Sequence, residues 1–411
     1  MAADTPSCTQ VGIVGAGPAG LALGRLLDLQ GIESVILEAR DREYIEKRVR
    51  AGVLEQGTVD LMQEIGVGDR MLREGLVHHG IYLRFDRRDH HIAFDELTGG
   101  RGITIYGQQE VVKDLIAARL EGGAPLLFEV EDVSLEDLDS DQPLIRYRHD
   151  GEARELRCDF VAGCDGFHGV CRDNAPEGAL RFYTRDFPFA WFGVLAQAPP
   201  STEELIYCSS ERGFALHSMR SPELSRLYFQ CDPDDEVGNW SDDQIWEELH
   251  TRLAREDDWA LTEGPLIEKG ITPMRSFVTE PMQYGRLYLA GDAVHIVPPT
   301  GAKGLNLAVA DVRVLAEGLG RWYEDGDESL LEAYSESCLR RVWRTQHFSW
   351  WMTWMLHRFP DDEDGFQAKL SRAQLDYVCS SEAAATTLAE NYVGLPMVGS
   401  PVGADEAAGH G

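Results

Sequence analysis

Three glycines and one acidic residue near the start of the chain have the spacing of a nucleotide-binding turn. Gly15, Gly17 and Gly20 follow an apolar run and open a helical pattern, and Glu38 closes the next apolar run. The glycines allow a tight turn, close approach of a pyrophosphate and close helix packing. The acid lies about 20 residues further on, where it can accept a hydrogen bond from a ribose hydroxyl. It favours an unphosphorylated ribose, so the pattern predicts FAD or NAD.

A loop far along the chain, GDAVHIVPPTGAKGLNLAVADV at residues 291–312, contains a second group suited to a cofactor. Asp292 follows a strand-like run, so its carboxylate can reach a ligand hydroxyl. Two prolines stiffen the loop and expose carbonyl groups. The glycines at 301 and 304 leave backbone N–H groups available beside a helix start. Such a loop suits the sugar-alcohol chain and the ring of a flavin.

Two further motifs lie where a bound nucleotide would pass. Asp165 ends a strand pattern at residues 155–164 and is followed by a glycine. The carboxyl ends of strands are the edge at which α/β sheets bind ligands. Arg48 and Arg50 alternate soon after the ribose acid, so we expect them near the phosphates of the cofactor.

Alternating segments between residues 189 and 232 predict an antiparallel sheet with one polar and cationic face. Side chains two apart in a strand point the same way. Ser218 and Arg220 therefore share a face, and so do Arg226 and Tyr228. Such a face inside an apolar sheet is costly without a ligand, although an ordinary surface ion pair is the alternative interpretation.

These residues must be positioned by a β-α-β opening, a central antiparallel sheet and a helical C-terminal part. The patterns predict strands at residues 11–16, 34–39, 155–164 and 287–290, and helices at 54–65, 109–121, 241–258, 304–323 and 328–358.

Bulk properties limit the classes of function. The net charge of −32 argues against a nucleic-acid partner, because phosphate binding needs basic surface. No apolar run approaches the roughly 18–20 residues that span a bilayer, and the first ten residues lack the pattern of a signal peptide. The eight cysteines form no C-x-x-C pair, and no metal site is expected. We expect a cytoplasmic protein with reduced thiols.

The motifs, in this order, resemble those of the single-component flavoprotein aromatic hydroxylases. The resemblance runs from about Val11 to Pro396 and leaves out the tail after Met397. It is carried by RVRAGVLEQGTVDL, ITIYGQ, AGCDGFHG, ELIYCSSERGFALHS, GDAVHIVPPTGAKGLNLA, HFSWWMTWMLHRFP and ENYVGLP.

The resemblance implies a mixed α/β (α+β) fold with three parts. These are a Rossmann-like FAD-binding domain at residues 1–180, an antiparallel substrate-binding domain at 181–276, and a flavin segment with C-terminal helices at 277–396. The small, polar and Gly-rich composition of residues 397–411 predicts a disordered tail.

The resemblance also implies a reaction. FAD is reduced by NADPH or NADH, O₂ adds to form a flavin hydroperoxide, and 4-hydroxybenzoate is hydroxylated ortho to its hydroxyl to give 3,4-dihydroxybenzoate. Flavin chemistry supplies the difficult step. The protein binds the flavin and the substrate, orients them and tunes the reactivity of the flavin. A related benzoate, such as 4-aminobenzoate or a dihydroxybenzoate, is an alternative substrate. A flavin oxidase or dehydrogenase is an alternative from another enzyme class.

By the same resemblance, Ser218, Arg220 and Tyr228 hold the substrate carboxylate. Tyr207 and Tyr392 form a proton relay at the phenol end, His78 is its outlet, and the Pro299 carbonyl steadies the substrate hydroxyl. The residues expected to bind FAD are Gly15, Gly17, Gly20, Glu38, Arg48, Arg50, Gln108, Asp165, Arg226, Asp292, Leu305 through its backbone, and Asn306.

Family positions near the nicotinamide cofactor match Tyr44, Arg48, His168, Arg172 and Arg275. Acidic and basic side chains alternate through residues 39–47, so the charges facing a 2′-phosphate nearly cancel. We therefore expect NADH to be used well. The family and a Trp-rich helix at residues 343–357 predict a homodimer, with ordinary core packing as the alternative for the tryptophans.

Overall fold

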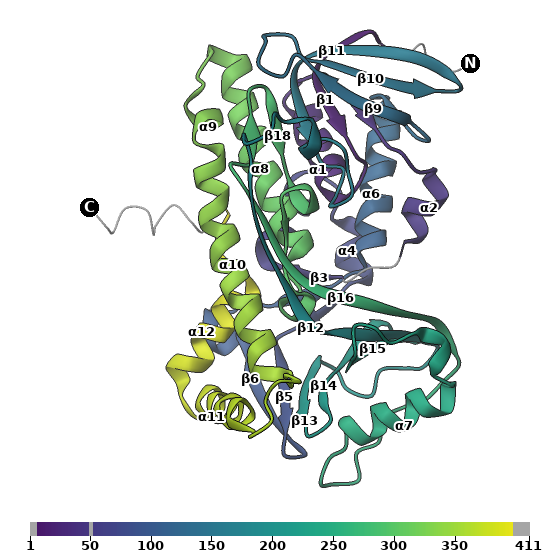
Figure 1. Cartoon of the computed structure of the whole chain (residues 1–411), viewed down its shortest axis with the longest axis vertical. Helices are drawn as coiled ribbons and strands as arrows, with labels where there is room; N and C mark the ends of the chain where they lie inside the picture. Colours follow the sequence, from purple (N-terminus) through teal and green to yellow (C-terminus); the bar gives the residue numbers. More distant parts are fainter. Residues whose placement is uncertain (1–5, 49–51, 398–411) are drawn as a thin grey trace.

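The computed structural model describes residues 6–48 and 52–397 of the chain. Two large sheets are placed one above the other, with helices beside them (Figure 1). Each sheet has eight strands, and a smaller sheet has three. The predicted mixed α/β class is confirmed.

The upper sheet contains the β-α-β opening. Its central strands are parallel, in the order β18-β11-β1-β2-β8, so their carboxyl ends meet at one edge. Its strands are β1 (Cys8–Val14), β2 (Ser34–Leu37), β8 (Leu126–Leu127), β9 (Glu131–Glu136), β10 (Leu144–His149), β11 (Glu152–Gly163), β17 (Gln283–Tyr284) and β18 (Leu287–Leu289).

The lower sheet has the order β19-β16-β12-β15-β14-β13-β5-β6 and is antiparallel except between β13 and β5. Its strands are β5 (Gly80–Phe85), β6 (Arg88–Ala93), β12 (Arg181–Ala196), β13 (Ile206–Ser210), β14 (Gly213–Ser221), β15 (Leu224–Cys231), β16 (Leu266–Glu280) and β19 (His295–Ile296). Strands from both sides of residue 180 therefore build this sheet. Sequence patterns missed β5, β6 and β16. In β16, Gly270 and Pro273 interrupt the run and most side chains are only part-buried, so no alternation marks the strand.

The small sheet links the two halves through β3 (Val53–Glu55), β4 (Leu76–His78) and β7 (Ile103–Ile105). The helices are α1 (Pro18–Leu29), α2 (Arg42–Lys47), α3 (Gln56–Glu64), α4 (Asp69–Glu74), α5 (Phe94–Thr98), α6 (Gln108–Glu121), α7 (Asp242–Arg252), α8 (Gly304–Asp325), α9 (Ser329–Glu332), α10 (Tyr334–Leu356), α11 (Phe366–Ser380) and α12 (Glu382–Val393). The helix predicted at 328–358 is divided at Ala333.

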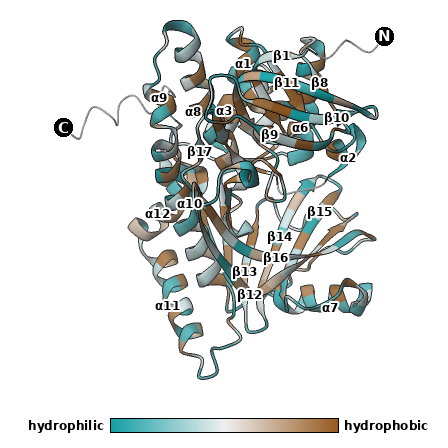
Figure 2. Ribbon diagram, turned by 45° about the horizontal axis from the view of Figure 1, so that its top comes forward, coloured by the Kyte–Doolittle hydropathy of each residue, from teal (hydrophilic) through white to brown (hydrophobic). Residues whose placement is uncertain are grey.

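Three apolar cores hold the elements together. One surrounds the upper sheet, and the other two cover opposite faces of the lower sheet. One lower face packs against α10, α11 and α12, and the other against α7. Helices such as α7 and α11 mix hydrophobic and hydrophilic residues, as expected of helices with one buried face (Figure 2). In Figure 1, α10 runs beside both halves of the molecule.

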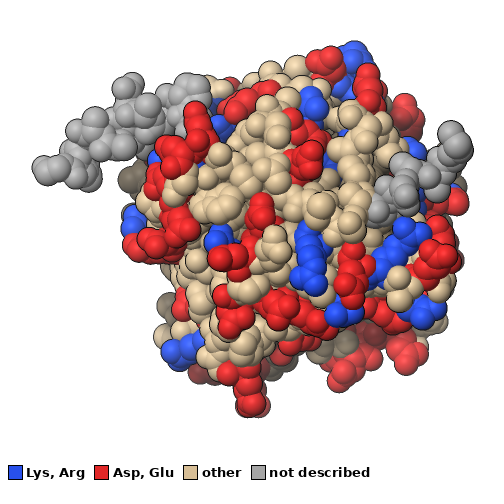
Figure 3. Space-filling view, turned by 90° about the horizontal axis from the view of Figure 1, so that it is seen from above, with Lys and Arg blue, Asp and Glu red and all other residues tan. Residues whose placement is uncertain are grey.

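Acidic side chains are spread over the surface seen from above, with fewer basic ones among them (Figure 3). No helix of the described residues is long and apolar enough to cross a membrane. Within the same residues, no three His, Cys, Asp or Glu side chains form a group that could hold a metal ion.

Candidate active site

The glycine turn between β1 and α1 has the geometry that a pyrophosphate needs. Gly15 has φ +102°, and a Cβ there would lie 2.4 Å from the Cys164 carbonyl oxygen. A Cβ on Gly20 would lie 2.0 Å from the Gly15 carbonyl oxygen. By contrast, a Cβ on Gly17 would meet no protein atom within 4 Å. Packing therefore requires glycine at positions 15 and 20. Gly17 leaves open space at the start of the twelve-residue helix α1, and helix starts of this kind bind anions.

Glu38 follows β2 and closes the same turn. Its carboxylate accepts hydrogen bonds from the backbone N–H of Ala16 at 2.7 Å and of Arg40 at 2.8 Å. A carboxylate has about four acceptor sites, so Glu38 retains capacity for a ribose hydroxyl. Arg50, which we expected near the phosphates, lies outside the described residues.

Asp165 and Asp292 follow the neighbouring parallel strands β11 and β18, at the edge where the glycine turn lies. Asp165 Oδ2 accepts the Cys171 N–H at 2.8 Å, but its Oδ1 is buried and has no hydrogen-bond partner in the described part of the chain. An orphaned buried acceptor is costly unless a ligand donates to it. This atom, the space at Gly17 and the Glu38 carboxylate together fit a dinucleotide cofactor.

The loop that carries Asp292 is held by a buried ion pair that sequence patterns missed. Asp311 of α8 accepts from the Gly291 N–H at 3.0 Å and from His295 Nε2 at 2.6 Å. Both side chains of the pair are about 1% exposed. In the sequence, Asp311 resembles an ordinary polar residue on a helix, so no signal marked it.

Further along this loop, backbone groups rather than side chains are available to a ligand. The Pro299 carbonyl accepts the Ala302 N–H at 2.9 Å and keeps a second lone pair. Asn306 uses its whole amide within the protein. Its Oδ1 accepts from Glu55 N and Thr58 Oγ1, and its Nδ2 donates to Val53 O and Ala302 O.

A cofactor would therefore meet Asn306 through its backbone N–H, beside that of Leu305. The first helical hydrogen bond of α8 runs from the Leu307 N–H to the Lys303 carbonyl, so the N–H groups before it have no partner within the helix. Gln108 is the first residue of α6, directly after Gly107.

The residues expected to hold a carboxylate lie together on β14 and β15. Ser218 donates to the Arg226 carbonyl at 2.8 Å, and Arg220 Nη1 lies 3.4 Å from Ser218 Oγ and donates to the Met219 carbonyl at 2.9 Å. Arg226 Nε donates to Tyr228 Oη at 3.2 Å, and its Nη1 pairs with a glutamate of β16.

Arg220 is the cation of this group that lacks a charge partner. Its Nε is buried with no acceptor, and no described carboxylate lies within ion-pair distance of it. Burial lowers the pKa of the Arg220 guanidinium, which the Tyr228 hydroxyl opposes. A part-buried guanidinium without a counter-ion favours an anionic ligand.

Two tyrosines from distant parts of the chain meet beside this group. Tyr207 of β13 and Tyr392 of α12 join through their hydroxyls at 2.5 Å, and each is 1% exposed. Burial raises the pKa of both hydroxyls. Tyr207, Leu216 and Tyr228 lie opposite one another on neighbouring strands, so the tyrosine pair and the residues expected to hold a carboxylate share one face of the sheet.

A buried lysine that sequence patterns missed contacts the tyrosine pair. Lys303 Nζ donates to Glu55 Oε1 at 2.7 Å and to the Tyr392 carbonyl at 2.8 Å. Both charged side chains are less than a tenth exposed. In the sequence, Lys303 looks like a solvated loop residue.

His78, the expected outlet of the relay, is 1% exposed at the end of β4. Neither ring nitrogen has a partner, and no hydrogen bond among the described residues joins it to Tyr392. Burial lowers the pKa of His78 to about 4, although the charge of Glu204 acts in the opposite direction.

The positions expected near a nicotinamide form two separate groups. Arg172 and Arg275 both lie over the Phe167 ring, at 5.2 Å and 5.1 Å, and the exposed His168 contacts the same ring edge-on. Arg172 also donates to the carbonyls of Phe167 and Ala293, so it ties the loop after β11 to the loop after β18.

The second group is Tyr44 of α2 and Arg48, which follows that helix. Arg40 and Arg48 lie over the exposed Tyr44 ring at 5.4 Å and 5.8 Å. No interaction between the described side chains joins it to the first group.

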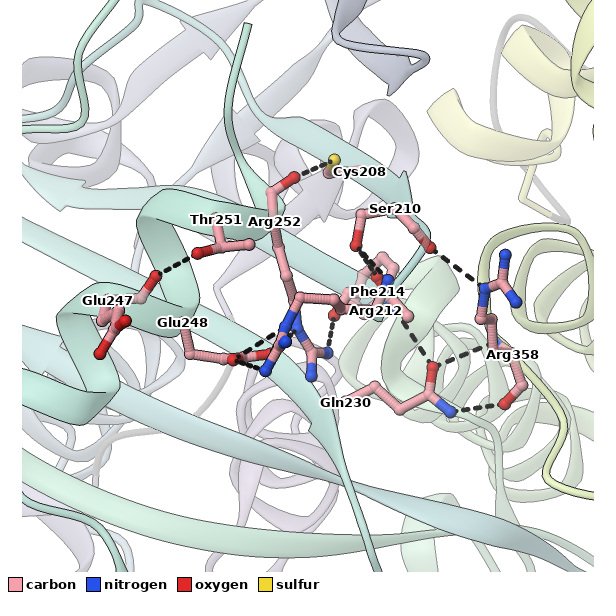
Figure 4. A network of polar contacts seen from close by, with 11 residues as sticks. Cys208, Ser210, Arg212, Phe214, Gln230, Glu247, Glu248, Thr251, Arg252 and Arg358 are labelled. Carbon is pink, nitrogen blue, oxygen red and sulfur yellow. Dashed lines mark hydrogen bonds and ion pairs between the residues drawn. The ribbon is translucent and has the colours of Figure 1, made fainter.

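A polar network supports the lower sheet at the open end of the hairpin formed by β14 and β15 (Figure 4). Glu248 of α7 accepts from Arg252 Nε at 2.6 Å, and Arg252 Nη1 donates to the Phe214 carbonyl at 2.9 Å. Gln230 of β15 donates to the carbonyl of Arg358, just after α10, at 2.6 Å. The hairpin is therefore fixed both to α7 and to the end of α10.

Buried neutral histidines predict an acid-sensitive fold. Burial lowers the pKa of His78 and of His217 to about 4, and that of His357 to about 3. An unfolded histidine binds its proton near pH 6.5, so between these values the unfolded chain holds more protons. The free energy of unfolding should therefore fall as the pH decreases from about 6.5 to about 4, by up to about 1.4 kcal/mol per pH unit for each histidine.

The expected pH dependence of the free energy of unfolding can be tested at one residue, His217. In urea unfolding across that pH window, His217→Asn should reduce the slope, whereas the same change at the exposed His347 should leave it unaltered. Parallel curves for the parent protein and His217→Asn would contradict the assignment. His295 is left in place because Asp311 raises its pKa despite burial, so it contributes with the opposite sign.

The chain is similar to known proteins over most of its length. The family described as FAD binding domain matches residues 8–349. The chain is 50% identical to p-hydroxybenzoate hydroxylase of Acinetobacter baylyi, over 94% of this chain and 96% of that protein. It is 28% identical to a probable NADH-specific resorcinol 4-hydroxylase of Rhodococcus jostii, over 79% of this chain and 61% of that protein.

Among solved structures, p-nitrophenol 4-monooxygenase from Pseudomonas putida matches with a TM-score of 0.79 and 19% identity, over 94% of this chain and 98% of that chain. This likeness shows a shared fold.

Proposed function

This chain belongs to the FAD binding domain family, and from that premise we propose that it is an FAD-dependent monooxygenase acting on 4-hydroxybenzoate. It hydroxylates the ring ortho to the existing hydroxyl and produces 3,4-dihydroxybenzoate, with O₂ and a nicotinamide cofactor as co-substrates. The near full-length relative at 50% identity is named for this substrate.

One observation carries the choice of substrate. A guanidinium without a charge partner, Arg220, and a buried tyrosine pair, Tyr207 and Tyr392, share one face of the lower sheet. A ring with a carboxylate at one end and a hydroxyl at the opposite end satisfies both. The Tyr228 hydroxyl lies beside the Arg220 guanidinium and can donate to a bound carboxylate. The Ser218 hydroxyl donates to the Arg226 carbonyl, so it would turn from that carbonyl to donate to the carboxylate.

FAD would be held by the glycine turn, Glu38, Asp165, Asp292 and the N–H groups at the start of α8, and when bound and reduced it supplies the activation of O₂. The residues of this chain orient the ring and move its proton. Arg220 fixes the carboxylate, and Tyr207 hydrogen-bonds the substrate hydroxyl. Tyr207 takes the phenol proton as it gives its own to Tyr392, whose proton leaves in turn toward His78, the proposed outlet. The ionised phenol has a higher electron density at the ortho carbon, which is the position attacked by an electrophilic oxygen. The Pro299 carbonyl accepts from the same hydroxyl before it ionises.

The proposal is tested by the substrate dependence of NAD(P)H oxidation, with identification of the products. In a panel of benzoates, 4-hydroxybenzoate should stimulate oxidation most and yield 3,4-dihydroxybenzoate. A higher kcat/KM with 4-aminobenzoate or a dihydroxybenzoate would identify the alternative substrate. NAD(P)H oxidation without any hydroxylated product would favour an oxidase.

We expect NADH to be at least as good a reductant as NADPH. On α2, Arg42 pairs with Glu46 at 2.6 Å and Lys47 pairs with Glu43, so two cations that could attract a 2′-phosphate are already neutralised. Steady-state kinetics should give a kcat/KM for NADH equal to or above that for NADPH. A strong preference for NADPH would refute this expectation.

The proposal includes a homodimer in the cytoplasm. Trp343 and Trp350 of α10 are 41% and 44% exposed. An open hollow beside α10 is lined by Pro281, Leu339 and Trp343 together with Glu280, Glu336 and Arg340. Apolar surface of this kind is typical of interfaces. Sedimentation should give twice the chain mass of 45.8 kDa, and a monomer at micromolar concentration would contradict the dimer.

A further inference from the structure

The imidazole of His357, directly after α10, has two hydrogen bonds that fix its protonation. Trp191 Nε1 donates to His357 Nε2 at 2.7 Å, and an indole N–H can only donate. His357 Nδ1 lies 2.9 Å from the Thr353 carbonyl, which can only accept. The ring is therefore neutral, with its proton on Nδ1. Burial lowers the pKa of His357 to about 3, which agrees with this assignment.

The same ring is held between aromatic side chains of the lower sheet. It stacks on Phe189 at 4.7 Å and on Phe214 at 4.3 Å, and it is 4% exposed. Both planes are nearly parallel to the imidazole, at 9° and 24°. His357 is therefore confined in plane by its hydrogen bonds and out of plane by the two rings.

Trp191 carries this constraint to the proposed substrate site. Its indole stacks on Phe214 at 4.8 Å and lies 5.1 Å from the Tyr228 ring. Phe214 in turn lies 6.2 Å from the ring of Tyr207. Trp191 therefore contacts Tyr228 directly and reaches Tyr207 through Phe214.

One helical turn earlier, Thr353 contacts the loop that precedes α8. Its hydroxyl donates to the Ser349 carbonyl at 2.7 Å, so its only proton is used there. The 2.8 Å contact between the hydroxyls of Thr353 and Thr300 must then have Thr300 as donor. Thr300 follows Pro299 in the loop before α8, and both threonines are 0% exposed. Residues 353–357 therefore contact the loop before α8 through Thr353 and the lower sheet through His357.

We propose that His357 is a positioning residue for the substrate site, acting as the neutral acceptor that fixes the Trp191 indole. Through this indole it positions Tyr228 directly and Tyr207 by way of Phe214. This role rests on the proposed function. His357 itself touches neither substrate nor cofactor.

The test measures 4-hydroxybenzoate binding to FAD-loaded variants. His357→Phe keeps the aromatic stack and removes the acceptor, so a buried indole N–H is left unpaired. We expect the dissociation constant to rise about 5- to 30-fold and the fraction of NAD(P)H spent on hydroxylation to fall. His357→Gln keeps an acceptor and should stay within about 3-fold of the parent. His347→Phe, at an exposed position of α10, is the matched control and should bind as the parent does.

The double variant Trp191→Phe/His357→Phe separates positioning from general damage. It has no unpaired donor, so its dissociation constant should not exceed that of Trp191→Phe alone. If His357→Phe does not fold, the comparison of the double variant with Trp191→Phe and the binding by His357→Gln still test the proposal. Unchanged binding by His357→Phe, additive losses in the double variant, or a His357→Gln variant as weak as His357→Phe would each overturn the proposal. If the parent itself does not bind 4-hydroxybenzoate, the proposed function fails instead.

Discussion

Arg220→Ala should weaken the binding of 4-hydroxybenzoate by about 30- to 5,000-fold while FAD stays bound. This is the range for removing one partner of a buried, hydrogen-bonded charge pair. The effect is expected to be large because the described chain offers no carboxylate to Arg220, so the substrate would be its counter-ion. FAD is proposed to bind at the other sheet, at the glycine turn and the start of α8, which the change does not touch.

A substrate titration followed by the flavin absorbance measures the dissociation constant of 4-hydroxybenzoate and shows whether FAD stays bound. 4-Hydroxybenzamide, which has no carboxylate, provides the control ligand. The parent should bind it far more weakly than the acid, and Arg220→Ala should no longer distinguish the two. Arg220→Lys keeps the charge but loses the planar fork, so intermediate binding is expected. If Arg220→Ala retained its preference for the acid, the carboxylate would lie elsewhere.

Tyr207→Phe should reduce the rate of hydroxylation by about 100-fold or more while substrate affinity changes by less than about 10-fold. Proton transfer by a positioned side chain typically contributes about 10² to 10⁴ in rate. The Tyr207 hydroxyl is joined to that of Tyr392 at 2.5 Å and both side chains are 1% exposed, so this pair is the route that the described residues offer to the phenol proton. The carboxylate end should still hold the ring.

Tyr392→Phe should give a similar loss, and the double variant should be little worse than either, since the two hydroxyls act as one unit. Tyr147→Phe, a buried tyrosine in the upper sheet, is the matched control and should leave the rate unchanged. The rate is read from product formation in a single turnover. A variant that hydroxylates slowly should release hydrogen peroxide in place of part of the product. A Tyr207→Phe enzyme with normal product yield would exclude the relay.

The sequence predicts the parts of the site that follow from local patterns. The turn containing Gly15, Gly17 and Gly20 was expected from its spacing, because the requirement for φ > 0 and for close approach acts within a few residues. Ser218 and Arg220 lie together as strand alternation predicts, because a two-residue period needs no knowledge of the rest of the fold.

Contacts between distant segments could not be predicted from local patterns. Tyr207 and Tyr392 are 185 residues apart, and only the family resemblance brought them together beforehand. The pairing of Lys303 with Glu55 joins positions 248 apart, and each looks like a solvated charge in its own segment. The full use of the Asn306 amide within the protein depends on β3 and α3, which no pattern around residue 306 reveals.

The central claim is that one atom of O₂ enters the aromatic ring of 4-hydroxybenzoate. The measurement is turnover under oxygen-18 gas with NADH or NADPH, followed by mass spectrometry of the product. We predict 3,4-dihydroxybenzoate with a single oxygen-18 atom, in the hydroxyl ortho to the original one, and one nicotinamide cofactor oxidised per product. Consumption of NAD(P)H with the label found only in hydrogen peroxide, or an unlabelled dihydroxybenzoate, would contradict the account.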